Sequence, residues 1–261
     1  MEPTVTMSIA KWSNGAWQAE KDVVVREDVV TVYVNEHELV RLHCSWDYPA
    51  ELAVGYLKAA RLINQKSDLR ELRIVPEERS VYVWTAESAT TAAVPAPSAV
   101  TSGCGQGPAF YHCWQSSFEL APVTSTFKLN PEGVLRLIRE LHQRSALFKL
   151  TGGVHSAALG GAQDLAIFRQ DIGRHNAVDK VIGHTILSDV ATTDKVLVIS
   201  GRISSDIILK AVLAGLPLVV SPSAPTHLAV ELARRLGITV VGFARGTRLS
   251  VYSEVWRLQR D

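Results

Sequence analysis

Hydrophobic positions in the second half of the chain form short apolar runs separated by stretches of helical spacing. The runs DLAIF, KVLVIS, PLVVS and ITVVGF begin at residues 164, 195, 217 and 238 and predict strands. A helix is expected to open at Asn130 and Pro131, and others follow the strands. Strands that alternate with helices through short loops predict a largely parallel sheet, covered on its faces. Apolar positions at helical spacing are Val134, Leu137, Ile138 and Leu141, then Val178, Val181, Ile182 and Ile186.

The first half has a different pattern, typical of a mixed α+β region. VVTVYVN (29–35), ELRIV (71–75) and SVYVW (80–84) are rich in β-branched and aromatic residues and predict strands. ELAVGYLKAARLI (51–63) predicts a helix whose apolar face holds Leu52, Tyr56, Ala59, Ala60 and Ile63. The change of pattern predicts two parts, residues 1–127 and 128–261.

Residues 85–108 lack periodicity and are rich in turn-forming residues, which is typical of a disordered segment or a working loop. Within it, TSGCGQGP places Cys104 between glycines, which give little packing and let the backbone move. Cys44 in LVRLHC and Cys113 in FYHCW have apolar neighbours and fit packing roles. Cys104 is therefore the candidate reactive thiol, provided that its pKa is lowered.

Four loops are expected where predicted strands end: RQDIGRHN, SGRISS, SPSAPT and FARGTR. In parallel sheets, ligands bind beyond the carboxyl ends of the strands. Four arginines of these loops converge on one rim, and several of the loops lead into helix N-termini, whose free N–H groups favour anions. They predict a site for a phosphate-bearing ligand, whereas the alternative is that the arginines are solvated caps. These arginines are Arg174, Arg202, Arg245 and Arg248.

Composition narrows the class of protein. The 261 residues are 47% hydrophobic and 20% charged, as in a soluble globular protein, and the net charge of +1 argues against broad nucleic-acid binding. Three widely spaced cysteines do not form a disulfide framework and suit a reducing cytoplasm. The N-terminus has no signal-peptide pattern, and no apolar stretch reaches the roughly 20 residues that span a bilayer. We expect a cytoplasmic protein without membrane segments.

Several familiar motifs are absent. No G-x-G-x-x-G follows a strand, no P-loop occurs, and no spacing of cysteines or histidines is typical of a metal site, so no metal is expected. TGGVHSAALGG (151–161) fits either a loop that approaches a ligand or a helix-to-strand turn. His155 and His175 fit either acid/base catalysis or structural hydrogen bonding. If one were catalytic, a nucleotide hydrolase or deaminase would be the alternative class of function.

The loop sequences also resemble a known family. TGGVHSAAL, DIGRHNAVDKVIG, SGRISSDIILKA, SAPTHLAVELA and GFARGTRLSVY occur in this order. They are similar to the motif series of the FdhD family, the formate dehydrogenase accessory sulfurtransferases, from about residue 24 to the end. The resemblance implies an N-terminal α+β part with a mobile cysteine loop. It also implies a C-terminal α/β/α part similar to cytidine deaminases, although the zinc signature of those enzymes is missing.

The resemblance implies a sulfurtransferase that takes persulfide sulfur from a cysteine desulfurase on Cys104. The sulfur would pass to the molybdenum or tungsten bis-molybdopterin guanine dinucleotide needed by formate dehydrogenase, and a guanine nucleotide would mimic this cofactor. FARGTR matches the family's cofactor-binding stretch, and a homodimer is implied. The expected cofactor-binding residues are Phe243, Ala244, Arg245, Gly246, Thr247 and Arg248, with Arg174, His175 and Arg202 from the neighbouring loops.

The chain departs from the family pattern in three places. The family commonly has C-x-x-C in the cysteine loop, but Gly107 stands where the second cysteine would be. YLKAARLI lacks the usual Glu-Gly pair, and Asp206 replaces a common glutamate. One cysteine can still hold a persulfide, because the chemistry needs one sulfur at a time. The alternative within the family is a cofactor-binding chaperone that has lost sulfur transfer.

Overall fold

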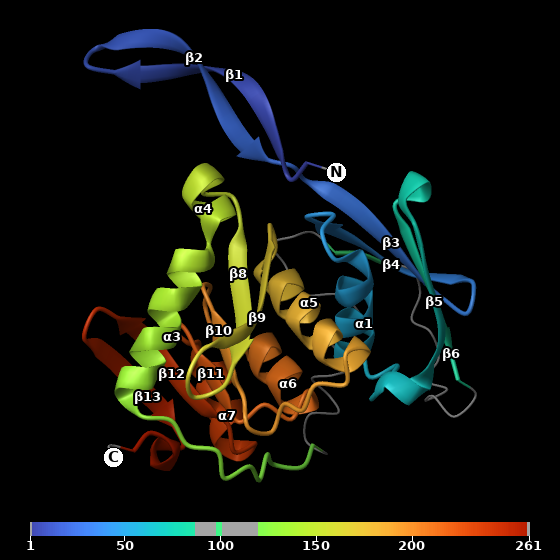
Figure 1. Ribbon diagram of the computed structural model, residues 1–261, viewed down its shortest axis with the longest axis vertical. Coiled ribbons are helices and arrows are strands. Elements are labelled where there is room, and N and C mark those ends of the chain that lie inside the picture. The colour runs from blue at the N-terminus through green and yellow to red at the C-terminus, as the bar shows by residue number, and fades with distance from the viewer. Residues whose placement is uncertain (1, 87–97, 101–119, 260–261) are drawn as a thin grey trace.

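The computed structural model describes residues 2–86, 98–100 and 120–259, with only the backbone for 98–100. Cys104 and Cys113 lie outside the described residues. Figure 1 shows a projecting two-stranded arm, a five-stranded sheet in the first half of the chain and a six-stranded sheet in the second half.

The arm is an antiparallel pair that the sequence analysis did not predict. β1 (Thr4–Ser13) and β2 (Ala16–Val25) pair along their whole length, and both project away from the rest of the molecule (Figure 1). Next to the turn, Trp12 and Trp17 form an edge-to-face pair with ring centroids 5.3 Å apart. Both rings remain exposed, at 57% and 69%.

The N-terminal sheet has the strand order β5-β6-β3-β4-β7, and one helix, α1, packs beside it. The predicted strands and helix are confirmed, but α1 ends at Ala59 rather than at Ile63. The sequence predicted too narrow an apolar face for this helix. The N-terminal sheet covers α1 on one side, and a helix from the second half of the chain covers it on another. The elements are β3 (Asp28–Val34), β4 (His37–Cys44), α1 (Pro49–Ala59), β5 (Leu69–Val75), β6 (Ser80–Thr85) and β7 (Ser98–Val100), with 3-10 turns at Lys66–Asp68 and Pro76–Glu78.

The C-terminal sheet has the order β13-β12-β11-β10-β8-β9. It is mixed rather than largely parallel, because only β10–β11 and β11–β12 are parallel pairs. Tight hairpins join β8 to β9 and β12 to β13, and a hairpin forces its two strands to run antiparallel. The strands are β8 (His155–Gly160), β9 (Leu165–Asp171), β10 (Val196–Ile199), β11 (Leu218–Val220), β12 (Thr239–Arg245) and β13 (Arg248–Ser253).

Helices cover both faces of this sheet, as predicted for the α/β class. α3 packs on one face with Ala158, Val198 and Val220, whereas α5 and α6 pack on the other with Leu159 and Leu197. The expected cap of α3 at Asn130 and that of α7 at Thr226 both accept a hydrogen bond from a helix N–H. The helices are α3 (Pro131–Arg144), α4 (Ala146–Thr151), α5 (Arg174–Leu187), α6 (Ser205–Leu213) and α7 (His227–Arg235), with a final 3-10 turn at Val255–Arg257.

The two halves share one apolar core. Buried residues of the N-terminal sheet, α1, α5 and α6 belong to a single cluster that runs across the predicted boundary at residues 127 and 128. α1 crosses α5 at close range, since a Cβ atom on Gly55 would overlap the carbonyl oxygen of Asp179. A Cβ atom on Gly183 would likewise overlap the carbonyl oxygen of Glu51. The N-terminal part is therefore packed tightly against the C-terminal part.

Candidate functional site

One edge of the C-terminal sheet collects the loops that the sequence analysis selected. β10, β11 and β12 run parallel, and β9 runs the same way because β8 is antiparallel to both β9 and β10. Their carboxyl ends therefore share an edge with the first residue of β8, His155, which pairs with Asp171. We call this the strand-end edge.

The four predicted arginines reach the strand-end edge from three loops. Arg174 is the first residue of α5 and is half-buried, whereas Arg202 follows β10 and is exposed. Arg245 and Arg248 pair across the turn between β12 and β13, where Gly246 has a φ of 60°. A two-residue hairpin turn needs a positive φ at this position, which glycine adopts without strain.

Two helix N-termini add backbone donors to this edge. α5 begins after Gly173 and α6 after Ser204, and neither N-cap residue bonds a helix N–H through its side chain. Free N–H groups at a helix start favour anions. Arginines and helix starts together form a donor set that suits phosphate groups.

The FARGTR segment forms the end of one hairpin rather than a loop after the last strand. A bulge places Phe243 at a φ of 51° with its ring 37% exposed, and its N–H donates to the Ser223 carbonyl at 3.0 Å. Bulges with positive φ in a non-glycine residue are frequent at functional sites. The Ala244 side chain lies in the core beneath α3, so only its backbone can face a ligand. Arg245, Gly246, Thr247 and Arg248 are all exposed.

Two histidines lie at the same edge. His155 Nδ1 is 3.4 Å from the hydroxyl of Ser200, and His175 Nε2 is 3.4 Å from that of Ser204. Burial, with the positive charge of nearby Lys210, Arg174 and His155, lowers the pKa of His175 to about 3. His175 is therefore neutral near pH 7 and can orient a ligand through hydrogen bonds.

The Asp206 carboxylate lies 3.6 Å from His175 Nε2. Burial raises the pKa of Asp206 to about 6, although Lys210 and Arg174 oppose this shift. The carboxyl group of Asp206 therefore lies next to the imidazole of His175 at the start of α6.

The shift at His175 predicts a change in the pH dependence of stability. The folded pKa of about 3 lies below the ordinary value of 6.5, so the stabilising contribution is present above pH 6.5 and is lost as pH falls toward 3. At pH 5 the loss amounts to about 2 kcal/mol. Urea unfolding at pH 7 and at pH 5 measures this loss as a decrease in the free energy of unfolding. We expect the decrease to be absent in His175→Gln. An identical pH dependence in the variant and the wild-type protein would contradict the buried, neutral state of His175.

The sequence analysis missed a buried ion network beside the strand-end edge. Lys180 Nζ lies 2.8 Å from Asp171 Oδ2 and also pairs with Asp47, and it donates to the Ser45 carbonyl at 3.0 Å. Lys180 and Asp171 have no exposed side-chain surface. Burial would lower the pKa of Lys180, but the two carboxylates outweigh burial and raise it, so the lysine stays charged. The network ties the segment before α1 to the end of β9.

Other candidate residues have clear positions. Cys44 is fully buried, as predicted for a packing residue, and burial raises the pKa of its thiol, which makes it unreactive. Gly152 ends α4 with a φ of 65°, so TGGVH is a helix-to-strand turn, and Gly153 also packs against Val25 at the base of the arm.

The described residues include no group of three His, Cys, Asp or Glu side chains that could hold a metal ion. No helix in the same part of the chain is long and apolar enough to cross a membrane.

Comparisons with known proteins extend this description. The family model described as the FdhD/NarQ family matches residues 25–259. The chain belongs to the FdhD/NarQ family. Curated relatives named sulfur carrier protein FdhD include those of Geobacillus kaustophilus, 37% identical over 96% of this chain and 95% of the relative, and Bacillus subtilis, 36% identical over 98% of each.

A solved structure shows the same fold. The crystal structure from Desulfotalea psychrophila, described as a candidate formate dehydrogenase accessory protein, matches with a TM-score of 0.83. It is 24% identical, and the match covers 99% of this chain and 100% of that one. The FdhD/NarQ match begins at the last residue of β2 and includes both the strand-end edge and the segment that carries Cys104.

Proposed function

We propose that this FdhD/NarQ protein is a sulfur carrier for formate dehydrogenase that holds sulfur as a persulfide on Cys104. In this proposal a cysteine desulfurase supplies the sulfur, and the acceptor is a molybdenum or tungsten bis-molybdopterin guanine dinucleotide. The names of the curated relatives support the sulfur-carrier role, and the description of the solved neighbour supports the link to formate dehydrogenase. Free thiols are needed, so the proposal places the reaction in the cytoplasm.

The direction of β7 is the observation that carries the proposal. β7 runs parallel to β4, with Val100 opposite Leu42. β4 continues to Cys44, and the next N–H, that of Ser45, donates to Asp171 Oδ2 at 3.1 Å beside the strand-end edge. Cys104 itself lies outside the described residues, but it follows Val100 by only four positions. A chain of four residues spans at most about 14 Å, so the direction of β7 supports a thiol tethered within reach of the strand-end edge.

The donor set at the strand-end edge suits the proposed acceptor, which is cargo rather than a resident cofactor. Its pyrophosphate links carry several negative charges. Arg245 and Arg248 can bind phosphate oxygens from the hairpin turn, and Arg174 and Arg202 extend the positive edge toward the start of α6. Neutral His175 can hydrogen-bond without adding charge. Phe243, Gly246 and Thr247 would provide the remaining contacts.

The proposed transfer to this chain needs no external oxidant. The Cys104 thiolate attacks the outer sulfur of the desulfurase persulfide, and a new sulfur–sulfur bond forms on Cys104. The sulfur–sulfur bond of the donor breaks, and its cysteine leaves as a thiolate. The persulfide on Cys104 then carries the sulfur to the acceptor at the strand-end edge.

Intact mass and peptide mapping after incubation with a desulfurase and cysteine test this step. We expect one added sulfur, on the peptide that contains Cys104, because Cys44 is buried with a raised pKa. Cys104→Ala should take up none. Sulfur found only on Cys44 or Cys113 would overturn the assignment.

The absence of a second loop cysteine favours one alternative, a chaperone that binds the cofactor without sulfur transfer, since Gly107 stands in its place. The same variant separates the two functions. Under sulfur transfer, Cys104→Ala binds the cofactor but does not activate formate dehydrogenase. Under the chaperone function, the variant activates formate dehydrogenase as well as the wild-type protein does.

A further inference from the structure

A cavity lies at the end of α5 that is remote from the strand-end edge. α5 and α6 begin at that edge and run away from it, and the 14 residues of α5 extend for about 20 Å. The cavity has a volume of about 160 Å³. A cavity of roughly 150 Å³ admits a benzene ring, so this one has room for a molecule of about six or seven non-hydrogen atoms.

One wall of the cavity carries positive charge. Lys58 lines it, and the Nζ of this lysine donates to the Asn64 carbonyl at 3.0 Å, whereas no carboxylate of a described residue lies within ion-pair distance. Burial lowers the pKa of Lys58, Asp68 opposes this shift, and the charge of Arg61 adds to it. Lys66, which is exposed, also lines the cavity. A ligand carboxylate would supply the negative charge that the half-buried ammonium group lacks.

The rest of the wall carries negative charge. α1, α5 and α6 all end at the cavity, which Lys58, Thr185 and Leu213 line from the last turns of these helices. The C-terminal end of a helix is partially negative and favours a cation. Asp189 follows α5, and its exposed carboxylate forms no hydrogen bond or ion pair with a described residue. A ligand ammonium group suits this side.

The two kinds of charge define the chemistry of the ligand. A simple anion would meet Asp189 and the helix ends, and a simple cation would meet the two lysines. An α-amino acid carries an ammonium group and a carboxylate on one carbon atom and so satisfies both sides. Ile182, Ile186 and Leu213 also line the cavity and can contact a short side chain. Alanine, serine and cysteine have the size that the volume admits.

We propose that this cavity binds a small α-amino acid, with its carboxylate at Lys58 and Lys66 and its ammonium group at Asp189 and the helix ends. The binding is independent of the proposed function, because it involves neither Cys104 nor the arginines of the strand-end edge. Cysteine and alanine are the two amino acids of interest. A cysteine desulfurase consumes the first and, by removing its sulfur, forms the second, so either would link the carrier to the supply of sulfur.

Isothermal titration of the full-length protein with L-alanine tests this proposal. We expect saturable binding at one site per chain. Propionate, which lacks the amine, and L-alaninamide, which lacks the carboxylate, should each bind at least about tenfold more weakly. A parallel titration with L-cysteine under reducing conditions shows which of the two amino acids binds more tightly.

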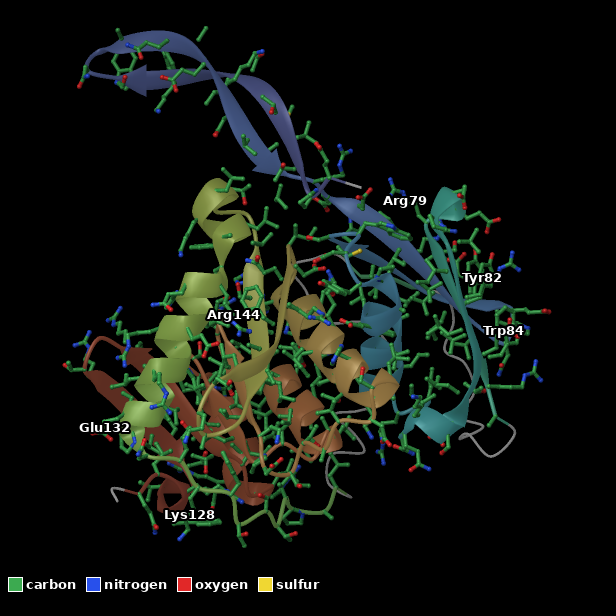
Figure 2. All side chains as sticks on the ribbon, in the orientation of Figure 1. Arg79, Tyr82, Trp84, Lys128, Glu132 and Arg144 are labelled. Carbon is green, nitrogen blue, oxygen red and sulfur yellow. The ribbon has the colours of Figure 1, made fainter. Side chains whose placement is uncertain are left out.

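Two variants and a matched control locate the site. Asp189→Asn and Lys58→Met should each weaken the binding of L-alanine about tenfold or more. Asp189 has a φ of 53°, a conformation that asparagine also adopts, so the first variant tests the ligand contact even if the half-buried Lys58 proves necessary for folding. Glu132→Gln also removes an exposed carboxylate, but Glu132 lies on α3, which covers the other face of the C-terminal sheet (Figure 2). It should bind L-alanine like the wild-type protein.

Three results would overturn the proposal. They are an absence of saturable binding, an affinity for propionate or L-alaninamide equal to that for L-alanine, and equal affinities of Asp189→Asn and Glu132→Gln. The titrations contain no sulfur donor, so a failure of Cys104 to accept sulfur would refute the proposed function and leave these results intact.

Discussion

Replacement of Lys180 by methionine is expected to destabilise the protein by about 3–5 kcal/mol. Methionine approximates the length of the lysine side chain but leaves Asp171 fully buried without its cation. Breaking a buried ion pair is costly because the remaining charge has lost its partner and cannot reach water. Urea unfolding, followed by tryptophan fluorescence and by circular dichroism, measures the loss.

Two variants show whether the buried charge causes this loss. Lys195→Met removes a lysine whose partner, Asp194, is 64% exposed, so we expect a change of at most about 1 kcal/mol. Adding Asp171→Asn to Lys180→Met should recover part of the stability, since asparagine carries no charge to leave unpaired. If Lys180→Met and Lys195→Met were equally mild, the network would not hold the segment before α1 in place.

The strand-end edge could be predicted from the sequence because its signals are local. Three of the four apolar runs end in a loop with an arginine, and Thr226 and Asn130 cap helices as their side chains predict. The relative directions of the strands in the sheet decide where those loops meet. The mixed sheet still brings these loops together. β8 runs opposite to both β10 and β9, so β9 ends at the same edge of the sheet as β10.

Features that depend on long-range packing could not be predicted. The Lys180 network joins residues more than 130 positions apart in sequence, and the spacing of Lys180 within its helix gives no sign of a partner near residue 47. The arm has exposed residues on both faces, so its hydrophobic pattern is weak.

The buried face of α1 shows the same limit. Periodicity predicted one apolar stripe, but α1 is covered by the N-terminal sheet and by α5, so Ala53, Val54 and Gly55 are buried as well. Small residues at a helix crossing carry little hydrophobic signal, although they set how closely two helices approach. α1 directly follows residues 45–48, and Lys180, which pairs with Asp47 from that segment, lies on α5.

The α1–α5 crossing predicts a large effect for Gly55→Ala. Alanine in a helix normally stabilises it relative to glycine, but here the added Cβ atom would overlap the Asp179 carbonyl oxygen and force the helices apart. We expect a loss of about 3 kcal/mol in urea unfolding. Gly161→Ala is the matched control, because nothing lies within 4 Å of its Cβ position, and it should change stability by less than about 0.5 kcal/mol. Equal or greater stability of Gly55→Ala would mean that the crossing is looser than the structure shows, and that the two halves of the chain can separate.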